Sequence, residues 1–536
     1  MKTALQKIFN FFRVKFFHSS VFWIVLSGAL TSLTLYSNKL FLLAWVSVAP
    51  LCYFLIDRRE SVIKCYFLML LWALVYYFML YTWFFSLYPL DIMGFTKAES
   101  VEVVIIIWCA VSVAQSLQMS LVGLVYGLIK PKGVSAPLVL GLLWVILEWA
   151  QGYGALAMNW GRLALSQYNF APAVQSASLF GSLFVTFLIV CINGLIALYL
   201  WTRVNLKTSA KSLYLAAAVI FLANICFGAA RMLAINAQIK KAPIVPIAAV
   251  QADFASEEKW DARPDEIFDA YYKITLEAVN AGAKVIVWPE TTIPIPLERS
   301  GYYSQLKNLA EENQLVFIIG SIYEKDDNVF NALYCIDCAK DRQLYFKRRL
   351  VPFGEFVPFE KFLSKFKIFQ KFNLFDQMMT SGKEAVAFDT SYGKFSGLIC
   401  FDSIIQRYGV ESVKKGAQAL FIATNDSWYI DSASIRQHYG HAVLRAVENN
   451  RFVVRAANAG VSGVISSAGT TLKSLKTRQD GYVLYNVPLI NRKTLYTLMG
   501  DFIAYIAIAC AVEAFIYFRF LEKLKNRAKE AAQEIY

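Results

Sequence analysis

Hydrophobic positions divide the chain into two apolar regions with a mixed region between them. Residues 20–235 contain a series of long apolar runs, residues 245–490 mix apolar and polar positions as a soluble domain does, and residues 498–520 are apolar again. A helix needs roughly 20 apolar residues to cross a hydrocarbon core of about 30 Å. The pattern therefore predicts eight membrane-spanning helices, at residues 20–36, 40–56, 63–88, 102–129, 136–151, 171–201, 211–234 and 498–519.

Lysine and arginine residues are distributed unevenly between these runs. They cluster before the first span, after the second, fourth and sixth spans, and after the last one, whereas the other connections contain few of them. Positive residues gather in cytoplasmic loops, so we expect both termini in the cytoplasm and residues 235–497 outside it. This placement accounts for much of the formal net charge of +14, and no nucleic-acid partner is expected.

The pattern also predicts how the chain is divided. We expect a membrane domain with seven spans at residues 1–235, an α/β domain at 236–497, and an eighth span with a basic cytoplasmic tail at 498–536. β-rich runs that alternate with helical ones are typical of a layered α/β domain. The expected strands are 244–251, 284–288, 315–320, 343–347, 395–400, 419–424, 452–457 and 461–466, and the expected helices are 263–282 and 303–313.

Three of these strands end on reactive side chains. Glu290 follows "VIVWP", Lys347 ends "QLYFK", and Cys400 ends "FSGLIC". The carboxylate can take the thiol proton, the thiolate can attack a carbonyl group, and the ammonium can stabilise the resulting oxyanion. Each residue alone also has an ordinary explanation: a helix cap, a surface cation and a buried filler. Together they predict acyl-transfer chemistry.

Cysteine usage is compatible with this interpretation of Cys400. Of the nine cysteines, only Cys335, Cys338 and Cys400 lie in the predicted outer domain. The CxxC spacing of Cys335 and Cys338 lacks a second pair or a nearby histidine for zinc, which leaves a local disulfide or two unrelated thiols. Cys400 is then the odd thiol in an oxidising compartment, and it needs a reason to be there.

The order and the local context of these three residues resemble the carbon–nitrogen hydrolase (nitrilase) superfamily, and within it the apolipoprotein N-acyltransferase family of bacterial membrane enzymes. The resemblance covers nearly the whole chain. It implies a nitrilase-like α-β-β-α sandwich as the catalytic domain. The segments that carry it are "VQADFASEEKW" (250–260), "VWPETTIP" (287–294), "YFKRRLVPFGEFVP" (345–358), "GLICFDS" (397–403), "TNDSW" (424–428), "HAVLRAVENNR" (441–451) and "RAANAGVSG" (455–463).

The resemblance implies roles for individual residues. Glu290 is the expected general base, Lys347 the oxyanion and positioning residue, and Cys400 the acylated nucleophile. Further residues that match family positions are Glu355, Asn331 and Asn425 near the triad and Trp260 and Trp428 near the substrate.

One motif departs from the family pattern. The family usually has Cys–Tyr–Glu at the nucleophile, whereas this chain has Cys400, Phe401 and Asp402. Phe401 keeps the ring without the hydroxyl, and Asp402 keeps the charge with a shorter reach. Phe401 and Asp402 are expected to support the active site. We expect the change to leave catalysis intact and to alter only the fine tuning of the enzyme.

Residues 356–379 carry a phenylalanine every three or four positions, including Phe366 and Phe369, with lysines between them. A helical apolar stripe with basic flanks is expected of a segment that lies in a lipid interface. We expect a mobile arm beside the active site, in which Phe366 and Phe369 bind lipid. A helix packed into the domain core is the alternative.

Several polar residues near the predicted spans have open roles. A carboxylate such as Glu148 inside a membrane segment is costly and faces protein or water. Arg162, with Trp160 and Tyr168, is expected at the headgroup level, either pairing with a donor phosphate or extending toward water. His438 and His441 lie three apart on a predicted helix without a third ligand, so no metal is expected.

The resemblance implies a reaction in two steps. A phospholipid donates an acyl group to Cys400 as a thioester, and the N-terminal lipidated cysteine of a diacylglyceryl apolipoprotein accepts it on its α-amino group. No cofactor is expected. We expect a multi-pass monomer in the bacterial inner membrane, with the catalytic domain on its outer face. A membrane-tethered amidase and a non-enzymatic scaffold are the alternatives.

Overall fold

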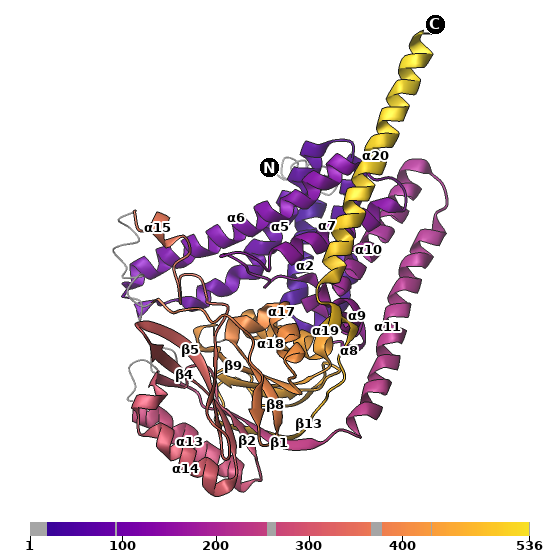
Figure 1. Ribbon diagram of the computed structural model, residues 1–536. Coiled ribbons are helices and arrows are strands. Elements are labelled where there is room, and N and C mark those ends of the chain that lie inside the picture. Colours follow the sequence, from indigo (N-terminus) through magenta and orange to yellow (C-terminus); the bar gives the residue numbers. More distant parts are fainter. Residues whose placement is uncertain (1–18, 92–93, 255–263, 366–377, 430, 535–536) are drawn as a thin grey trace, which may run out of the picture.

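The computed structural model describes residues 19–91, 94–254, 264–365, 378–429 and 431–534. It consists of a helical part, residues 19–239 and 502–534, and an α/β part, residues 244–488 (Figure 1). Helix α11 (Lys211–Ile239) runs down one side of the molecule and leads into the first strand. Helix α20 (Phe502–Glu534) returns from the α/β part and extends beyond the other helices.

The helical part has breaks that the sequence pattern does not predict. Gly181 has φ +76, a conformation that glycine adopts readily, and it separates α9 from α10. The predicted span at 171–201 is therefore wrong before Ser182, because continuous helix starts only there. The elements before α11 are α2 (Ser20–Tyr36), η1 (Asn38–Leu43), α3 (Ala44–Ser47), α4 (Ala49–Arg58), α5 (Val62–Leu80), η2 (Tyr81–Leu87), α6 (Lys97–Ile129), α7 (Ser135–Ala150), η4 (Leu163–Gln167), α8 (Ala171–Val174), α9 (Ala177–Phe180), α10 (Ser182–Trp201) and η5 (Thr202–Leu206).

Six helical segments among the described residues are long and apolar enough to cross a membrane. They are Asn38–Arg58, Val62–Leu87, Lys97–Ile129, Ser182–Leu206, Lys211–Ile239 and Phe502–Ala531. The shorter apolar helices α2 and α7 coincide with two further predicted spans. At about 1.5 Å per residue they reach roughly 25 Å, slightly less than a hydrocarbon core. The eight-span arrangement stays a prediction.

The α/β part contains two sheets. The first has the order β13-β1-β2-β4-β5-β6, with β3 paired to β4, and the second has the order β12-β11-β10-β9-β8-β7. All eight expected strands are present, and β3, β5, β7, β12 and β13 are additional. The strands are β1 (Ile244–Gln251), β2 (Val285–Val287), β3 (Ile293–Pro296), β4 (Val316–Lys325), β5 (Asn328–Asp337), β6 (Gln343–Phe346), β7 (Phe388–Thr390), β8 (Gly393–Ile399), β9 (Ala419–Asn425), β10 (Phe452–Asn458), β11 (Gly463–Ile465), β12 (Thr471–Ser474) and β13 (Gly481–Pro488).

Helices cover the outer faces of these two sheets. Ile247 and Leu333 from the first sheet share a buried cluster with Phe395 and Phe421 from the second, so the sheets pack face to face. Helices α13 and α14 pack on the first sheet, and α17 and α18 pack on the second. The layers form the expected α-β-β-α sandwich. The helices are α13 (Pro264–Asn280), η6 (Leu297–Arg299), α14 (Tyr302–Asn313), α15 (Glu360–Leu363), η7 (Cys400–Ile404), α17 (Gln406–Lys414), η8 (Ser427–Tyr429) and α18 (Ala433–Asn449), with α19 (Leu495–Met499) following the sandwich.

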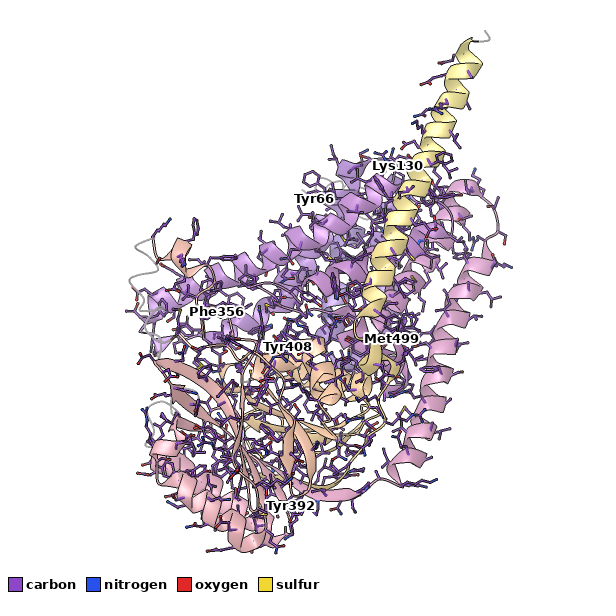
Figure 2. All side chains as sticks on the ribbon, viewed as in Figure 1. Tyr66, Lys130, Phe356, Tyr392, Tyr408 and Met499 are labelled. Atoms are coloured by element: carbon purple, nitrogen blue, oxygen red, sulfur yellow. The ribbon has the colours of Figure 1, made fainter. Side chains whose placement is uncertain are left out.

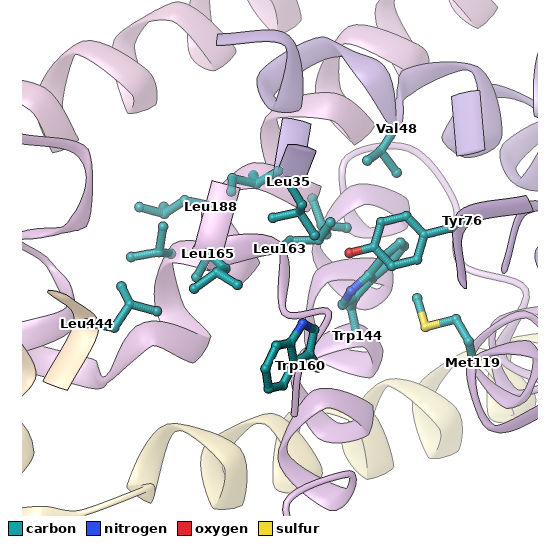
Figure 3. Packing of buried hydrophobic residues seen from close by; sticks show 14 of the residues in the cluster. Leu35, Val48, Tyr76, Met119, Trp144, Trp160, Leu163, Leu165, Leu188 and Leu444 are labelled. Carbon is teal, nitrogen blue, oxygen red and sulfur yellow. The ribbon is translucent and has the colours of Figure 1, made fainter. Parts of the chain in front are cut away.

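Helix α18 lies between the second sheet and the helical part. Figure 3 shows Leu444 of α18 close to Leu165 and Leu188 of the helical part, and all three belong to one buried cluster. Every residue of α18 except Arg436 is buried. The helical part and the sheet that carries Cys400 therefore share one core. Figure 2 shows Tyr408 of α17 on the side of the sandwich that faces the helical part, whereas Tyr392 lies at the opposite end of the sheets.

Candidate active site

Glu290, Lys347 and Cys400 each follow the end of a strand. Runs of branched apolar residues favour strands, and β2, β6 and β8 end at Val287, Phe346 and Ile399. Pro289 has no N–H group to continue a ladder. All three side chains are buried. The structure thus holds the three predicted residues at the ends of rigid strands, a common position for functional side chains.

The ammonium group of Lys347 lies between two carboxylates. Its Nζ atom donates to Glu290 Oε1 at 2.7 Å and to Glu355 Oε1 at 2.8 Å. Asn331 Nδ2 donates to the same two oxygens, at 2.8 and 3.1 Å. Burial lowers the pKa of Lys347, but Glu290, Glu355 and Cys400 outweigh it and hold that pKa well above its usual value. Lys347 therefore stays charged.

The remaining carboxylate oxygens are held by backbone groups. Glu290 Oε2 accepts a hydrogen bond from the N–H of Asn425 at 2.9 Å, and Glu355 Oε2 accepts one from the N–H of Val351 at 2.8 Å. The side chain of Asn425 accepts from Asn458 Nδ2 at 2.9 Å. The predicted residues Glu355, Asn331 and Asn425 are therefore assembled around Glu290 and Lys347.

Cys400 occupies a sharp turn between β8 and η7. Its φ is +46, a left-handed conformation that is uncommon for residues other than glycine and often occurs at functional sites. Its carbonyl oxygen accepts a hydrogen bond from Ser403 Oγ at 2.7 Å and lies 3.1 Å from His438 Nε2. Side chains from two elements thus hold the strained peptide in place.

The thiol of Cys400 is protonated in the resting site. Burial and, to a lesser extent, the charge of Glu290 raise its pKa to about 12, although Lys347 acts in the opposite direction. The two carboxylates and one ammonium of Glu290, Glu355 and Lys347 leave a net negative charge near the sulfur, which disfavours a thiolate. A base would have to take this proton before the sulfur could act as a thiolate.

Asp402 connects the turn of Cys400 to the strand end that carries Lys347. Its Oδ1 accepts from the N–H groups of Arg348 and Arg349 at 3.2 and 2.7 Å, and its Oδ2 accepts from Tyr345 Oη at 2.8 Å and the N–H of Ile399 at 3.1 Å. Burial raises the pKa of Asp402 to about 6. Both carboxylate oxygens of the shorter Asp402 side chain thus accept hydrogen bonds that fix these backbone groups and Tyr345.

Some predicted site residues lie elsewhere or outside the described residues. Phe401 points toward the helical part, where its ring stacks on Trp160 with centroids 6.3 Å apart. Trp428 is half-buried in η8. Trp260, Phe366 and Phe369 lie outside the described residues.

A buried cluster behind Cys400 was missed by the sequence reasoning. Asp426 accepts from Arg455 Nη2 at 2.8 Å, and its Oδ1 lies 3.1 Å from His438 Nδ1. Burial raises the pKa of Asp426, but Arg455 and His438 outweigh it and lower that pKa to about 2. The sequence signal that could have identified Asp426 is its position directly after Asn425, at the end of a strand. Another missed residue is Tyr429, whose hydroxyl oxygen lies 3.9 Å from Cys400 Sγ.

The two roles expected for Arg162, pairing with a donor phosphate or extending toward water, are wrong. Its side chain is 3% exposed and lies 3.5 Å from Glu148 Oε2, because the guanidinium compensates for the buried carboxylate. It also donates to Gln406 Oε1, and Gln406 Nε2 donates to Asp501 Oδ1 at 2.8 Å. Trp160, which donates to Gln437 Oε1 at 2.6 Å, and Tyr168 are likewise buried.

The structure also bears on the predicted CxxC pair and on the two histidines. Cys335 and Cys338 are free thiols, so the disulfide alternative is wrong. For His438 and His441, the finding is that the described residues contain no group of three or more His, Cys, Asp or Glu side chains arranged for an ion.

Family models match both parts of the chain. The model of the carbon–nitrogen hydrolases matches residues 246–493, and that of the apolipoprotein N-acyltransferase N-terminal domain matches residues 27–195. The α/β part is thus a carbon–nitrogen hydrolase domain. The apolipoprotein N-acyltransferase of Gloeobacter violaceus is 29% identical over 480 residues, which cover 88% of each chain. That of Geobacter metallireducens is 28% identical over 507 residues, which cover 92% of this chain and 94% of its own.

These findings together identify the family. The chain belongs to the apolipoprotein N-acyltransferase family, and its apolar helices indicate a bacterial membrane protein. Among solved structures, an amidase from Nesterenkonia sp. is similar over 46% of this chain and 92% of its own, with 16% identity and a TM-score of 0.36.

Proposed function

We propose that the chain transfers an acyl group from a phospholipid to the α-amino group of the N-terminal lipidated cysteine of an apolipoprotein, through a thioester on Cys400. One observation carries this proposal: the turn of Cys400 is packed directly against the helical part. Phe401 stacks on Trp160, and Gln406, the first residue of α17, accepts from Arg162. A hydrolase of small soluble amides needs no such contact, whereas an enzyme with two lipid substrates needs its nucleophile at the membrane.

In the first step, Glu290 takes the Sγ proton of Cys400, and the thiolate attacks the ester carbonyl carbon of the phospholipid. A C–S bond forms and a C–O bond breaks. The protonated Glu290 returns the proton to the departing alkoxide, which leaves as a lysophospholipid. The charged Nζ group of Lys347 stabilises the oxyanion between bond formation and bond cleavage.

In the second step, the free α-amino group of the acceptor attacks the thioester carbon. A C–N bond forms, the C–S bond breaks, and a proton from the amine passes through Glu290 to the thiolate. Glu355 and Asn331 keep Lys347 and Glu290 in place throughout. Glu355 accepts hydrogen bonds from Lys347 and Asn331, and Asn331 also donates to Glu290. The net charge of the site is the same before and after the cycle.

We also propose the placement that the charge distribution predicts. The eight spans divide the chain into a seven-span membrane domain at 1–235, a catalytic domain at 236–497 outside the cytoplasm, and a final span with a cytoplasmic tail at 498–536. The position of α2 and α7 inside the helical part supports counting both as spans. The enzyme is proposed to work as a monomer in the inner membrane.

The phenylalanine-rich segment is proposed to contact lipid. In the described portion, Phe359 and Phe362 are 63% and 59% exposed and lie at α15, on the side of the sandwich that faces the helical part (Figure 1). Large exposed rings are costly in water and favourable in a lipid interface. Phe366 and Phe369 continue this segment.

The test is mass spectrometry of the purified full-length protein after incubation with phospholipid vesicles. The expected result is one fatty acyl adduct, located on the peptide that contains Cys400, together with released lysophospholipid. Cys400→Ser should abolish the adduct, whereas Cys338→Ser, which removes a thiol outside the site, should retain it. Release of ammonia from small amides without any adduct from phospholipid would overturn the proposal and favour a tethered amidase.

A further inference from the structure

Tyr429 places a hydroxyl group beside the nucleophile. Its Oη atom lies 3.9 Å from Cys400 Sγ. Within the described part of the chain, that sulfur is the only hydrogen-bond partner of the hydroxyl. Phe401, the direct neighbour of the nucleophile, carries no hydroxyl that can serve instead. Tyr429 is the last residue of η8, which follows the strand next to β8 in the second sheet.

Aromatic rings from both parts of the molecule hold the tyrosine ring. Its centroid lies 5.7 Å from that of Trp83 in η2 and 6.4 Å from that of Trp160, both in the helical part, and 6.5 Å from the ring of His438 in α18. All three contacts are edge-to-face, a favourable geometry for aromatic pairs. The direction of the hydroxyl toward the sulfur is therefore set by packing.

The hydroxyl keeps its proton in this environment. Burial raises the pKa of Tyr429 well above its usual value, and the charges of Cys400, Asp426 and Glu290 raise it further. A thiolate carries no proton and can only accept. Whenever the sulfur is negative, the contact with Tyr429 must therefore be a hydrogen bond donated by the phenol.

Among the described residues, no other hydroxyl or ammonium near the sulfur is equally free to donate. Thr424 also lies close enough to act on the thiol, but its Oγ1 donates to Asp426 Oδ1 at 3.0 Å. Lys347 is shared between Glu290 and Glu355. A neutral donor can stabilise the thiolate without changing the charge balance of the site.

We propose that Tyr429 is a further catalytic residue, whose hydroxyl donates a hydrogen bond to Cys400 Sγ while the sulfur is a thiolate. The proposal rests on the proposed role of Cys400 as nucleophile. The hydrogen bond forms when Glu290 removes the thiol proton, and it forms again when the acceptor amine displaces the thiolate from the thioester. Tyr429 thus stabilises the attacking group in one step and the leaving group in the other.

The experiment compares Tyr429→Phe with wild type in the full-length protein in detergent. The rate of Cys400 alkylation by iodoacetamide is followed against pH, with peptide mass spectrometry to separate Cys400 from Cys338. This readout needs no lipid substrate, so it is independent of the acyl-transfer reaction. The charged or titratable groups that face the thiol are Glu290 and Lys347 after β2 and β6, Asp426 and Tyr429 after β9, and His438 on α18.

A hydrogen bond to a charged group is worth enough to change the thiolate population by about 10-fold or more. Alkylation of Cys400 in Tyr429→Phe should therefore be about 10-fold slower at a given pH, with the profile displaced to higher pH. The matched control is Tyr439→Phe, which removes a hydroxyl bonded to Thr471 Oγ1 at 2.9 Å on the same helix as His438. It should leave the profile unchanged.

A second variant covers the case in which Tyr429→Phe does not fold. Incorporation of 3-fluorotyrosine at position 429 keeps the shape and makes the phenol a stronger donor, so alkylation should become faster. Unchanged alkylation profiles in the folded Phe variant or in the fluorinated protein would overturn the proposal. Absence of an acyl adduct in wild type would instead overturn the proposed function and leave the alkylation result intact.

Discussion

Asp402→Asn is expected to make the protein more stable and less active. The pKa of Asp402 rises from 3.8 to about 6 on folding, and at 1.36 kcal/mol per unit the charged form is disfavoured in the fold by about 3 kcal/mol relative to the neutral form. An amide removes this penalty. It also turns an N–H donor toward the N–H of Ile399, and this lost hydrogen bond costs about 1–3 kcal/mol. The net expectation is a gain of about 1 kcal/mol.

The sign of the pH dependence follows from the same shift. Because the folded chain binds the proton of Asp402 more tightly, protonation contributes stability that is complete below about pH 4 and is lost as pH rises through about 6. The difference in melting temperature between Asp402→Asn and wild type should therefore grow between pH 5 and pH 8. Asp389→Asn, at an exposed position in β7, is the matched control and should show no such trend.

Activity should follow the opposite direction. The carboxylate holds the N–H groups of Arg348 and Arg349, directly after Lys347, so the amide loosens the strand end that carries the ammonium. Single-turnover acylation of Cys400 should fall about 10-fold at pH 8, as expected for a small displacement of a catalytic group. Wild type should lose activity below about pH 6, when Asp402 takes up its proton. A stability difference that is flat from pH 5 to pH 8, or full activity of the amide variant, would refute this reasoning.

Three other outcomes are expected. Glu290→Gln should speed up alkylation of Cys400 while abolishing acylation, because loss of a neighbouring negative charge lowers the thiol pKa by about 1–3 units; slower alkylation, measured by peptide mass spectrometry, would contradict this. Arg162→Leu should destabilise the protein by about 3–5 kcal/mol by leaving Glu148 buried without its cation, and the melting temperature should recover in part in the double variant with Glu148→Leu. Phe359→Ser with Phe362→Ser should reduce transfer from vesicle lipid while sparing short soluble acyl esters, and equal loss on both substrates would argue against a lipid contact.

The strand ends that carry Glu290, Lys347 and Cys400 were predictable because each strand is a compact run of branched apolar residues with a reactive residue at its end. This information is local. The positions of Glu355 and Asn331 also agree with the family resemblance. The roles of these residues in catalysis stay predictions, since the geometry gives their arrangement and not their chemistry.

The partners of Asp402 and Tyr429 were not predictable because they are separated in sequence and meet only through the sheet order. Tyr345 pairs with a carboxylate from the other sheet, and no periodicity in the chain signals that meeting. The polar sequence of α18 gives a related lesson. Trp160 and Ser182 of the helical part donate hydrogen bonds to Gln437 and Glu448, so a helix with many polar residues is interior.

The hydrogen bond between Gln406 and Asp501 has a consequence for how the enzyme is made. A ribosome synthesises Glu290, Lys347 and Cys400 well before Asp501, which lies just ahead of α20. Until Asp501 has been synthesised, Gln406 Nε2 lacks this acceptor, whereas its Oε1 can already accept from Arg162. The polar contacts of the segment that follows Cys400 are thus completed only when the last part of the chain has been made.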